Sequence, residues 1–381
     1  ERERSIDAAF ASTFDWVYCD PTEYDKPWDN FDSFLLKDAS TYWVTGKPGS
    51  GKSTLIKYIA ENSSTTEKLN AWAQDHDLFV AQHYFSYRAS ELQRSEIGML
   101  RSLLHQILQD QPDFIKQGFS ERYRVLCSTA GGVSGEFGTE ELRTCLRRVI
   151  DSRISAFFLF IIDGLDESNT KRKGLPKLVE YINSLGTHRN VKVLISSRPW
   201  PEIEESLEGC PRLKVHELTR DDIRYFTESK INNHHRSRTL QLQDPTAINQ
   251  LVTEIVDSSS GVFLWVALVV QSLLQGLRNH DTISDLFARL QELPKELDDL
   301  FRHMWEQVDP RYKAQASRLL QLVKYGTIHG HISVLGISFA EEDEKFATEL
   351  EVKPLTKETC DYRIGTTRGH LLARCAGLVE V

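Results

Sequence analysis

Three short stretches of the chain combine residue types that handle phosphates, metal ions and protons. The first, Gly46-Lys-Pro-Gly-Ser-Gly-Lys-Ser-Thr54, fits the pattern G-x-x-x-x-G-K-[ST]. Small glycines let backbone N–H groups wrap a polyphosphate, and a helix that starts after them points its positive end at it. In such a loop Lys52 reaches the β- and γ-phosphates, and the Ser53 hydroxyl holds Mg²⁺. The predicted phosphate contacts are Gly46, Lys47, Pro48, Gly49, Ser50, Gly51, Lys52, Ser53 and Thr54.

The second stretch, Phe160-Ile-Ile-Asp-Gly-Leu-Asp-Glu167, is an apolar run that ends in acids. In phosphate-binding-loop proteins such a run supplies a further Mg²⁺ contact, here Asp163. Asp166 and Glu167 follow at the carboxyl end of the strand, where ligands of open α/β sheets bind. One of them would orient or deprotonate an attacking water, with Glu167 the first choice and Asp166 the second. The alternative is an acidic turn that caps the next helix.

The third stretch, Leu194-Ile-Ser-Ser-Arg-Pro199, is an apolar strand that ends in two hydroxyls and an arginine. Arg198 would lie at the same sheet edge as the phosphates. A guanidinium there binds a γ-phosphate and so distinguishes ATP from ADP. The alternative is a surface arginine in a turn before Pro199.

These stretches need a sheet that brings their carboxyl ends together. A strand is predicted from Thr41 to the first loop, and further strands over 78–85, 156–162, 191–195 and 213–218. Helices are predicted over 53–60, 94–108, 140–151 and 175–186, whereas the polar residues 61–77 suggest a helix end and a loop. This alternation predicts an α/β, doubly wound, mostly parallel sheet over 41–218.

Strand patterns fade after about residue 220. Thr219, with Asp221 and Asp222 behind it, is predicted to cap the next helix. Helical patterns cover 220–233, 246–257, 260–277, 281–292, 295–308 and 310–325. The expected domains are an N-terminal linker with helices (1–40), a nucleotide-binding core (41–218), a helical domain (219–293) and a further partial domain (294–381).

Composition excludes some classes of protein. The 381 residues are 40% hydrophobic and 27% charged, with a net charge of −9. That balance argues against a general nucleic-acid binder or a protein of anionic membranes. The longest apolar run, 262–270, is too short to span a bilayer. Six scattered cysteines without a C-x-x-C pair suggest reduced thiols in the cytoplasm. Because the chain starts at Glu1 and not Met, we expect a piece of a longer protein.

Together, Trp43-Val-Thr-Gly-Lys-Pro-Gly-Ser-Gly-Lys-Ser-Thr54, Ile162-Asp-Gly-Leu-Asp-Glu167 and Ile195-Ser-Ser-Arg-Pro199 resemble the NACHT class of STAND P-loop NTPases. The resemblance is closest to the nephrocystin-like type found in fungal NLR-like proteins. It implies a switch that holds ADP as a closed monomer and, after exchange for ATP, opens a winged-helix domain, here begun at 294–381, and self-assembles. It further implies an N-terminal effector and C-terminal sensor repeats outside this chain, and a role in fungal innate immunity such as heterokaryon incompatibility.

The resemblance also implies where adenine would bind. In relatives the segment before the phosphate-binding loop lies near the base, which points to Trp16 and Val17. The helical domain closes over the base, and Gly261-Val-Phe263 takes the place of a glycine–x–proline turn. Phe263 is therefore a candidate contact, with a core aromatic on helix 260–277 as the alternative.

The sequence leaves three candidate functions. The first is a switch that hydrolyses ATP slowly, and the second is a fast-turnover ATPase of the motor or kinase type. A motor usually carries its two acids side by side, but here Gly164 and Leu165 separate Asp163 from Asp166. The third is a scaffold that keeps ADP as a structural ligand, which the intact acids and Arg198 argue against.

Overall fold

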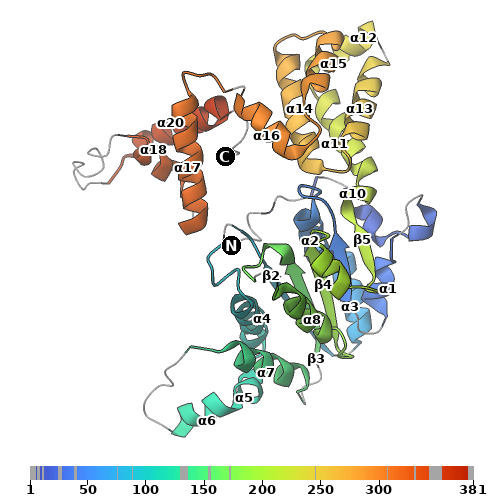
Figure 1. Ribbon diagram of the computed structural model, residues 1–381, viewed down its shortest axis with the longest axis vertical. Coiled ribbons are helices and arrows are strands. Elements are labelled where there is room, and N and C mark those ends of the chain that lie inside the picture. Colours follow the sequence, from blue (N-terminus) through green and yellow to red (C-terminus); the bar gives the residue numbers. More distant parts are fainter. Residues whose placement is uncertain are drawn as a thin grey trace. The chain divides into compact units, whose positions relative to one another are not determined.

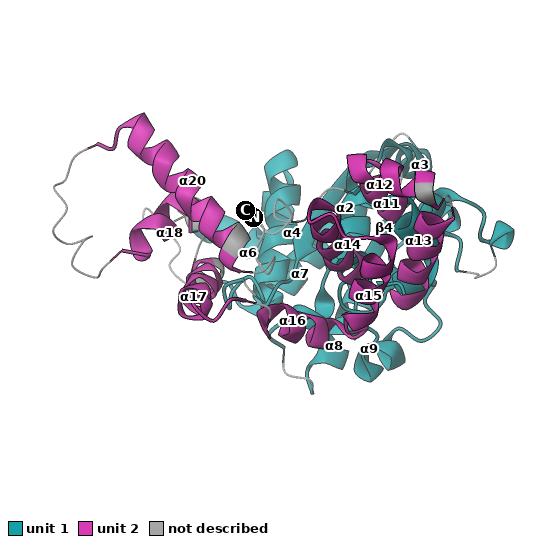
Figure 2. Cartoon of the chain, turned by 90° about the horizontal axis from the view of Figure 1, so that it is seen from above, with its two compact units in different colours: residues 1–226, 260–264 teal, residues 227–259, 265–381 magenta. Residues whose placement is uncertain are grey.

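The structure is a computed structural model, and it divides the chain into two compact units (Figure 2). The first holds residues 1–226 and 260–264, and the second 227–259 and 265–381. The structure describes residues 6, 9–10, 13–24, 28–37, 41–74, 76–87, 89–128, 136–152, 156–170, 173–244, 246–306, 308–329, 332–342 and 354–375.

The first unit is built on a five-stranded sheet in the order β2-β3-β4-β1-β5 (Figure 1). Every neighbouring pair of strands runs parallel. The strands are β1 (Thr41–Thr45), β2 (Asp77–Tyr84), β3 (Ala156–Asp163), β4 (Val191–Ser197) and β5 (Arg212–Lys214). From β1 the chain crosses to the edge strand β2, returns through β3 and β4 to the neighbour of β1, and then forms β5 on the other side of β1. The strand order thus reverses at β1, and the predicted α/β P-loop NTPase fold is confirmed.

Both faces of the sheet are buried, which explains the uninterrupted apolar sequence of β3. Phe158 and Phe160 belong to one core cluster, and Leu159 and Ile161 to another. The first cluster includes side chains of α4 (Glu96–Asp110), α7 (Thr139–Ile150) and α8 (Leu175–Leu185). The second includes side chains of α1 (Phe31–Leu36), α2 (Lys52–Glu61) and α3 (Ser63–Ala73). Figure 1 shows the strands between these two sets of helices.

Two predictions about this unit were wrong in detail. Residues 61–77 are not mainly a loop, because α3 buries Leu69 and Trp72 on an otherwise polar helix. The strand predicted over 213–218 is only β5, and a short helix α10 (Val215–Leu218) follows it. The remaining elements are η2 (Asp15–Tyr18), η3 (Pro21–Glu23), α5 (Phe114–Gly118), α6 (Ser120–Ser128), η4 (Leu165–Glu167) and α9 (Pro201–Ser206).

The second unit is helical in the residues described, as the sequence predicted. Its helices are α12 (His235–Gln243), α13 (Ala247–Ser258), α15 (Ile283–Glu292), α16 (Leu297–Glu306), α17 (Lys313–His329), α18 (Val334–Ala340) and α20 (Lys357–Arg374). Two further helices, α11 (Arg220–Asn232) and α14 (Phe263–Arg278), cross the division between the units. The polar helix α12 was not predicted. Within the described residues, none of the helices has the length and apolar character that crossing a membrane requires.

Candidate functional site

The loop between β1 and α2 has the backbone that its glycines predict. Gly49 and Gly51 adopt φ angles of 70° and 93°, in the left-handed region that glycine enters without strain. A Cβ atom on Gly46 would lie 2.8 Å from Ser50 Oγ and 3.3 Å from His216 Nδ1, so any larger residue there would displace these side chains. Gly51 is the N-cap of α2 and has no side chain with which to cap it. This is the arrangement that an anion site at a helix N-terminus requires.

Lys52, at the end of this loop, interacts electrostatically with the acids at the sheet edge. Its Nζ donates hydrogen bonds to the carbonyl oxygens of Gly46 and Lys47, each at 2.9 Å. Burial lowers the pKa of Lys52, and the carboxylates of Asp166 and Asp163 oppose that shift. The lysine and both acids therefore share one electrostatic environment.

Asp163 ends β3 in a nearly fully buried position and is held by the neighbouring strand β4. The hydroxyl of Ser196 donates to Asp163 Oδ1 and accepts from the backbone N–H of Gly164 at 3.1 Å. Gly164 has a φ of 69°, and a Cβ there would lie 3.0 Å from the carbonyl oxygen of Phe85. Glycine thus follows Asp163 because the backbone turns left-handed and approaches the end of β2.

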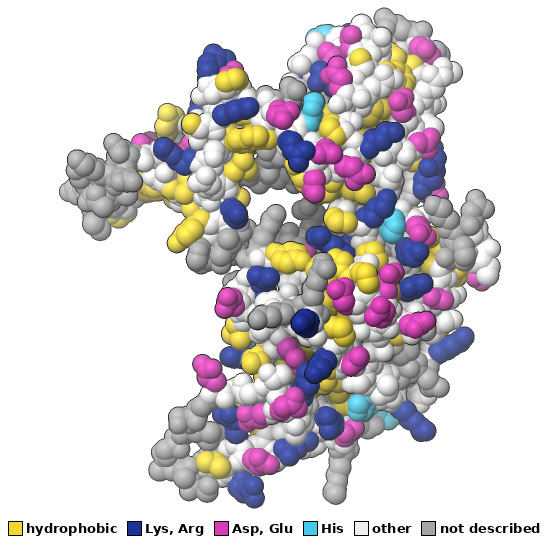
Figure 3. Space-filling view, viewed as in Figure 1, with side chains coloured by type: hydrophobic (Ala, Val, Ile, Leu, Met, Phe, Trp, Pro, Cys, Tyr) yellow, Lys and Arg dark blue, Asp and Glu magenta, His cyan; other side chains and the backbone are white. Residues whose placement is uncertain are grey.

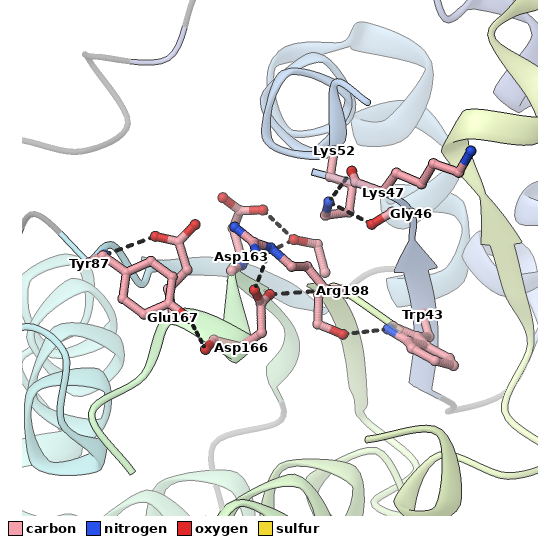
Figure 4. A network of polar contacts seen from close by, with 12 residues as sticks. Trp43, Gly46, Lys47, Lys52, Tyr87, Asp163, Asp166, Glu167 and Arg198 are labelled. Atoms are coloured by element: carbon pink, nitrogen blue, oxygen red, sulfur yellow. Dashed lines mark hydrogen bonds and ion pairs between the residues drawn. The ribbon is translucent and has the colours of Figure 1, made fainter. Parts of the chain in front are cut away.

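Asp166 and Arg198 form an ion pair at the same edge (Figure 4). Arg198 Nε lies 3.2 Å from Asp166 Oδ2, and the backbone N–H of Arg198 donates to Asp166 Oδ1 at 3.0 Å. The Asp166 side chain is 2% exposed and that of Arg198 36%. The buried carboxylate therefore anchors the guanidinium, whose remaining surface is open to solvent.

Glu167 is positioned by Tyr87, which follows the end of β2. The backbone N–H of Tyr87 donates to Glu167 Oε2 at 2.8 Å, and its hydroxyl donates to the carbonyl oxygen of Asp166 at 3.0 Å. Neither Tyr87 nor Ser196 was predicted from the sequence to be part of the site. Both lie at strand ends on the predicted edge, and that position was the available signal.

A cation such as Mg²⁺ would find oxygen ligands here. Ser53 is in the first turn of α2, and Asp163 is buried at the end of β3. A hydroxyl and a carboxylate suit Mg²⁺, which takes few protein ligands and keeps phosphate oxygens and water as the others. Over the described part of the chain, no three His, Cys, Asp or Glu side chains gather to hold a metal by themselves.

The segment before β1 is tied to the start of α11. Trp16 and Val17 are buried at 8% and 0% exposure. Trp16 Nε1 donates to Asp222 Oδ2 at 2.8 Å, and the backbone N–H of Phe14 donates to the same oxygen at 3.2 Å. Phe14 has a φ of 73°, and its Cζ would lie 3.3 Å from a Cβ on Gly51. Phe14 thus brings the segment before β1 next to the phosphate-binding loop.

The turn 260–264 lies against the same loop. The backbone N–H of Leu264 donates to the carbonyl oxygen of Gly49 at 2.9 Å, and Lys47 Nζ donates to that of Ser260 at 3.3 Å. Gly261 has a φ of 76°, and a Cβ there would lie 1.8 Å from the carbonyl oxygen of His216. Phe263, the first residue of α14, packs on Phe226 with ring centroids 5.0 Å apart.

Several buried polar atoms in β1, in the loop and after β5 have no hydrogen-bond partner in the described parts of the chain. They are Thr45 Oγ1, Ser50 Oγ, His216 Nδ1 and Thr219 Oγ1. The predicted helix start after Thr219 is confirmed, because α11 begins at Arg220 with Asp221 and Asp222 in its first turn, but the predicted side-chain cap by Thr219 was wrong. The Thr219 hydroxyl caps nothing, and Asp222 accepts from Phe14 and Trp16 instead, because its buried position lies beside the N-terminal segment.

Solved structures that match this chain include Drosophila ORC bound to DNA, with 14% identity, a TM-score of 0.36, and coverage of 88% of this chain and 91% of that one. Another is the Aeropyrum pernix ORC1 protein in complex with DNA, with 14% identity, a TM-score of 0.35, and coverage of 92% and 86%. A variant of Thermotoga maritima RuvB has 13% identity, a TM-score of 0.30, and coverage of 85% and 86%.

Relatives in sequence are more specific. Residues 307–381 match a domain of unknown function, DUF7791. The vegetative incompatibility protein HET-E-1 of Podospora anserina is 28% identical over 286 residues, which cover 71% of this chain and 19% of that protein. The chain thus spans about a fifth of the length of this relative. Residues 13–198 match the family described as nephrocystin 3, N-terminal. The family match and the similarity to HET-E-1 together support a nephrocystin-like protein of the NACHT/NLR type.

Proposed function

We propose that this chain is the ATP/ADP-dependent switch of an NLR-like signalling protein, which binds and slowly hydrolyses ATP to control self-assembly. One observation carries the proposal. The buried Asp166 holds Arg198 at the sheet edge, where Lys52 interacts electrostatically with Asp163, Asp166 and Arg198. Similarity to an incompatibility protein supports a signalling role over a metabolic one.

The site residues have separate tasks in this proposal. Lys52, whose ammonium is satisfied by two loop carbonyls, turns to the β- and γ-phosphates when nucleotide binds. Ser53 and Asp163 would hold Mg²⁺, which neutralises phosphate charge. The γ-phosphate competes with Asp166 for Arg198, so the position of the arginine depends on which nucleotide is present.

Hydrolysis is expected to be slow because both candidate bases are engaged. Asp166 pairs with Arg198, and Glu167 accepts a hydrogen bond from the Tyr87 backbone. A general base must be within hydrogen-bond reach of its water and able to take the proton. Glu167 remains our first choice for that role, and Asp166 the second.

The remaining assignments extend the same proposal. The adenine side of the proposed nucleotide site is lined by Phe14, Trp16, Val17 and Phe263. The proposed domains are a linker (1–40), a nucleotide-binding core (41–218), a helical lid (219–293) and a partial winged-helix domain (294–381). The effector and sensor repeats lie outside the chain, and the protein works in the cytoplasm. Acidic and basic side chains alternate over the described surface seen in Figure 3, which supports a protein partner over nucleic acid.

The test is to identify the nucleotide that co-purifies and then to measure ADP affinity and ATP turnover. We expect tight ADP binding, turnover below about one per second, and loss of binding in Lys52→Ala. Glu167→Gln should slow hydrolysis and keep ATP binding. Turnover far above one per second on a monomer would instead favour the motor or kinase type, and normal binding by Lys52→Ala would overturn the site assignment.

A further inference from the structure

The loop between β2 and α4 contacts the turn that carries Asp166 and Glu167. Tyr87 lies at the start of this loop and Arg94 near its end. Tyr87 donates from its backbone N–H to Glu167 Oε2 at 2.8 Å and from its hydroxyl to the carbonyl oxygen of Asp166 at 3.0 Å. As Figure 4 shows, one residue thus binds the side chain of one acid and the backbone of the other.

Arg94 holds the same turn from the other end of the loop. Its Nε donates to the carbonyl oxygen of Glu167 at 3.4 Å, and its own carbonyl oxygen accepts from the backbone N–H of Asn169 at 2.9 Å. The guanidinium also lies over the Tyr87 ring, 5.4 Å from its centroid, which is within the range of a cation–π interaction. Glu167 is therefore held through both its side chain and its backbone by one loop.

The loop is itself fixed to the sheet. His83, buried near the end of β2, has its Nε2 atom 3.0 Å from the carbonyl oxygen of Gln93. A carbonyl oxygen only accepts, so His83 donates from Nε2. At the start of the loop, the backbone N–H of Phe85 donates to the carbonyl oxygen of Asp163 at 2.9 Å and continues the pairing of β2 with β3. A loop anchored at both ends can fix the position of Glu167.

The position in which Glu167 is held is turned away from the phosphate-binding loop. Asp166 and Asp163 raise the pKa of Lys52 more than Glu167 does. Because Coulombic interactions weaken with distance, this order fits a Glu167 carboxylate that is more remote from the ammonium. In Figure 4 Glu167 lies beside Tyr87, with Asp163 between it and Lys52. A general base must be within hydrogen-bond reach of its water, so Glu167 has to turn from Tyr87 before it can act at a γ-phosphate.

We propose that Tyr87 and Arg94 are positioning residues that hold Glu167 in a resting position and so restrain ATP hydrolysis. This inference deepens the proposed function and rests on it. Neither residue takes part in nucleotide binding in this arrangement, whereas the base acts only when the loop releases it. A weaker hold on Glu167 should therefore raise the rate of hydrolysis and leave nucleotide affinity unchanged.

Arg94→Ala and, separately, Tyr87→Phe test the proposal, because each removes one hydrogen bond from the loop to the turn. ADP affinity is measured by calorimetry. Hydrolysis is measured in a single turnover with the protein in excess over ATP, so that slow release of ADP does not mask it. We expect hydrolysis about three- to tenfold faster in each variant, as for one hydrogen bond lost from the resting position, with ADP affinity unchanged. An unchanged or slower rate in either variant that binds ADP normally would overturn the proposal.

A double variant and a matched control complete the experiment. Arg94→Ala combined with Glu167→Gln should hydrolyse ATP no faster than Glu167→Gln alone, because no base is left to release. A gain that persists without Glu167 would contradict the restraint. Arg101→Ala, which removes an exposed arginine of α4, controls for the lost charge and should hydrolyse ATP at the wild-type rate.

The wild type separates the two proposals. A wild-type chain that binds ADP but hydrolyses no ATP contradicts the proposed function and the restraint with it. Wild-type hydrolysis with unchanged rates in Arg94→Ala and Tyr87→Phe contradicts the restraint alone.

Discussion

Replacement of Asp222 by asparagine should change how the stability of the chain depends on pH. Burial raises the pKa of Asp222 from its ordinary 3.8 to about 6, although hydrogen bonds from Trp16 and Phe14 favour the charged form. Between these two pH values the folded chain holds a proton that the unfolded chain has released. The stabilising contribution is thus complete below about pH 4 and is lost as the pH rises through about 6.

The size of this effect follows from the pKa. Each pKa unit is worth about 1.4 kcal/mol, so the free energy of unfolding should fall by about 3 kcal/mol between pH 4 and 8 because of Asp222. Asp222→Asn can still accept from Trp16 and Phe14 but does not titrate. Its stability relative to the wild type should therefore rise by about 3 kcal/mol across this range.

Urea unfolding of both proteins at intervals from pH 4 to 8 provides the assay, and the difference between them cancels the other titrating groups. Asp221→Asn, which removes the same charge from the exposed neighbouring position, controls for net charge. A difference between Asp222→Asn and wild type that stays constant from pH 4 to 8 would refute the reasoning.

Three further substitutions test the site. Ser196→Ala should weaken Mg²⁺-dependent ADP binding about tenfold, because Asp163 loses the hydroxyl that orients it. The control Ser197→Ala, which loses the hydrogen bond from Trp43 Nε1, should bind ADP normally. Equal losses of affinity in the two variants would contradict the role of Ser196. Gly164→Ala should lower the free energy of unfolding in urea by at least about 1–2 kcal/mol, the cost of a left-handed residue with a Cβ; an unchanged midpoint would argue against that backbone. Gly261→Ala should destabilise the chain more than Gly164→Ala in thermal unfolding, since its Cβ would collide with the carbonyl oxygen of His216. A smaller loss of stability than in Gly164→Ala would refute the close packing of Gly261 on His216.

The fold and the centre of the site were predictable because their signals are local. The glycine spacing of 46–51 and the apolar runs of β3 and β4 each lie within about ten consecutive residues. Parallel strands then place the ends of those runs at one edge. Lys52, Asp163 and Arg198 therefore came together as expected.

The rest depends on contacts between residues far apart in the chain. Asp222 and Trp16 are separated by 206 positions, and Tyr87 and Glu167 by 80. No periodicity in the sequence indicates such pairs. Thr219 looked like a helix cap because a threonine before two acids usually is one, and only the structure reveals that its hydroxyl is unused. Similarly, the polar sequence of α3 hid the few apolar residues that hold it on the sheet.

The central claim, that the bound nucleotide controls assembly, is tested most directly by the mass of the chain in solution. The mass is measured by light scattering with ADP and, separately, with Mg²⁺ and a non-hydrolysable ATP analogue, after binding of both has been verified. We predict the mass of one chain with ADP and of several chains with the analogue, whereas Lys52→Ala should stay at one chain in both. An identical mass of the wild type with either nucleotide would contradict the claim.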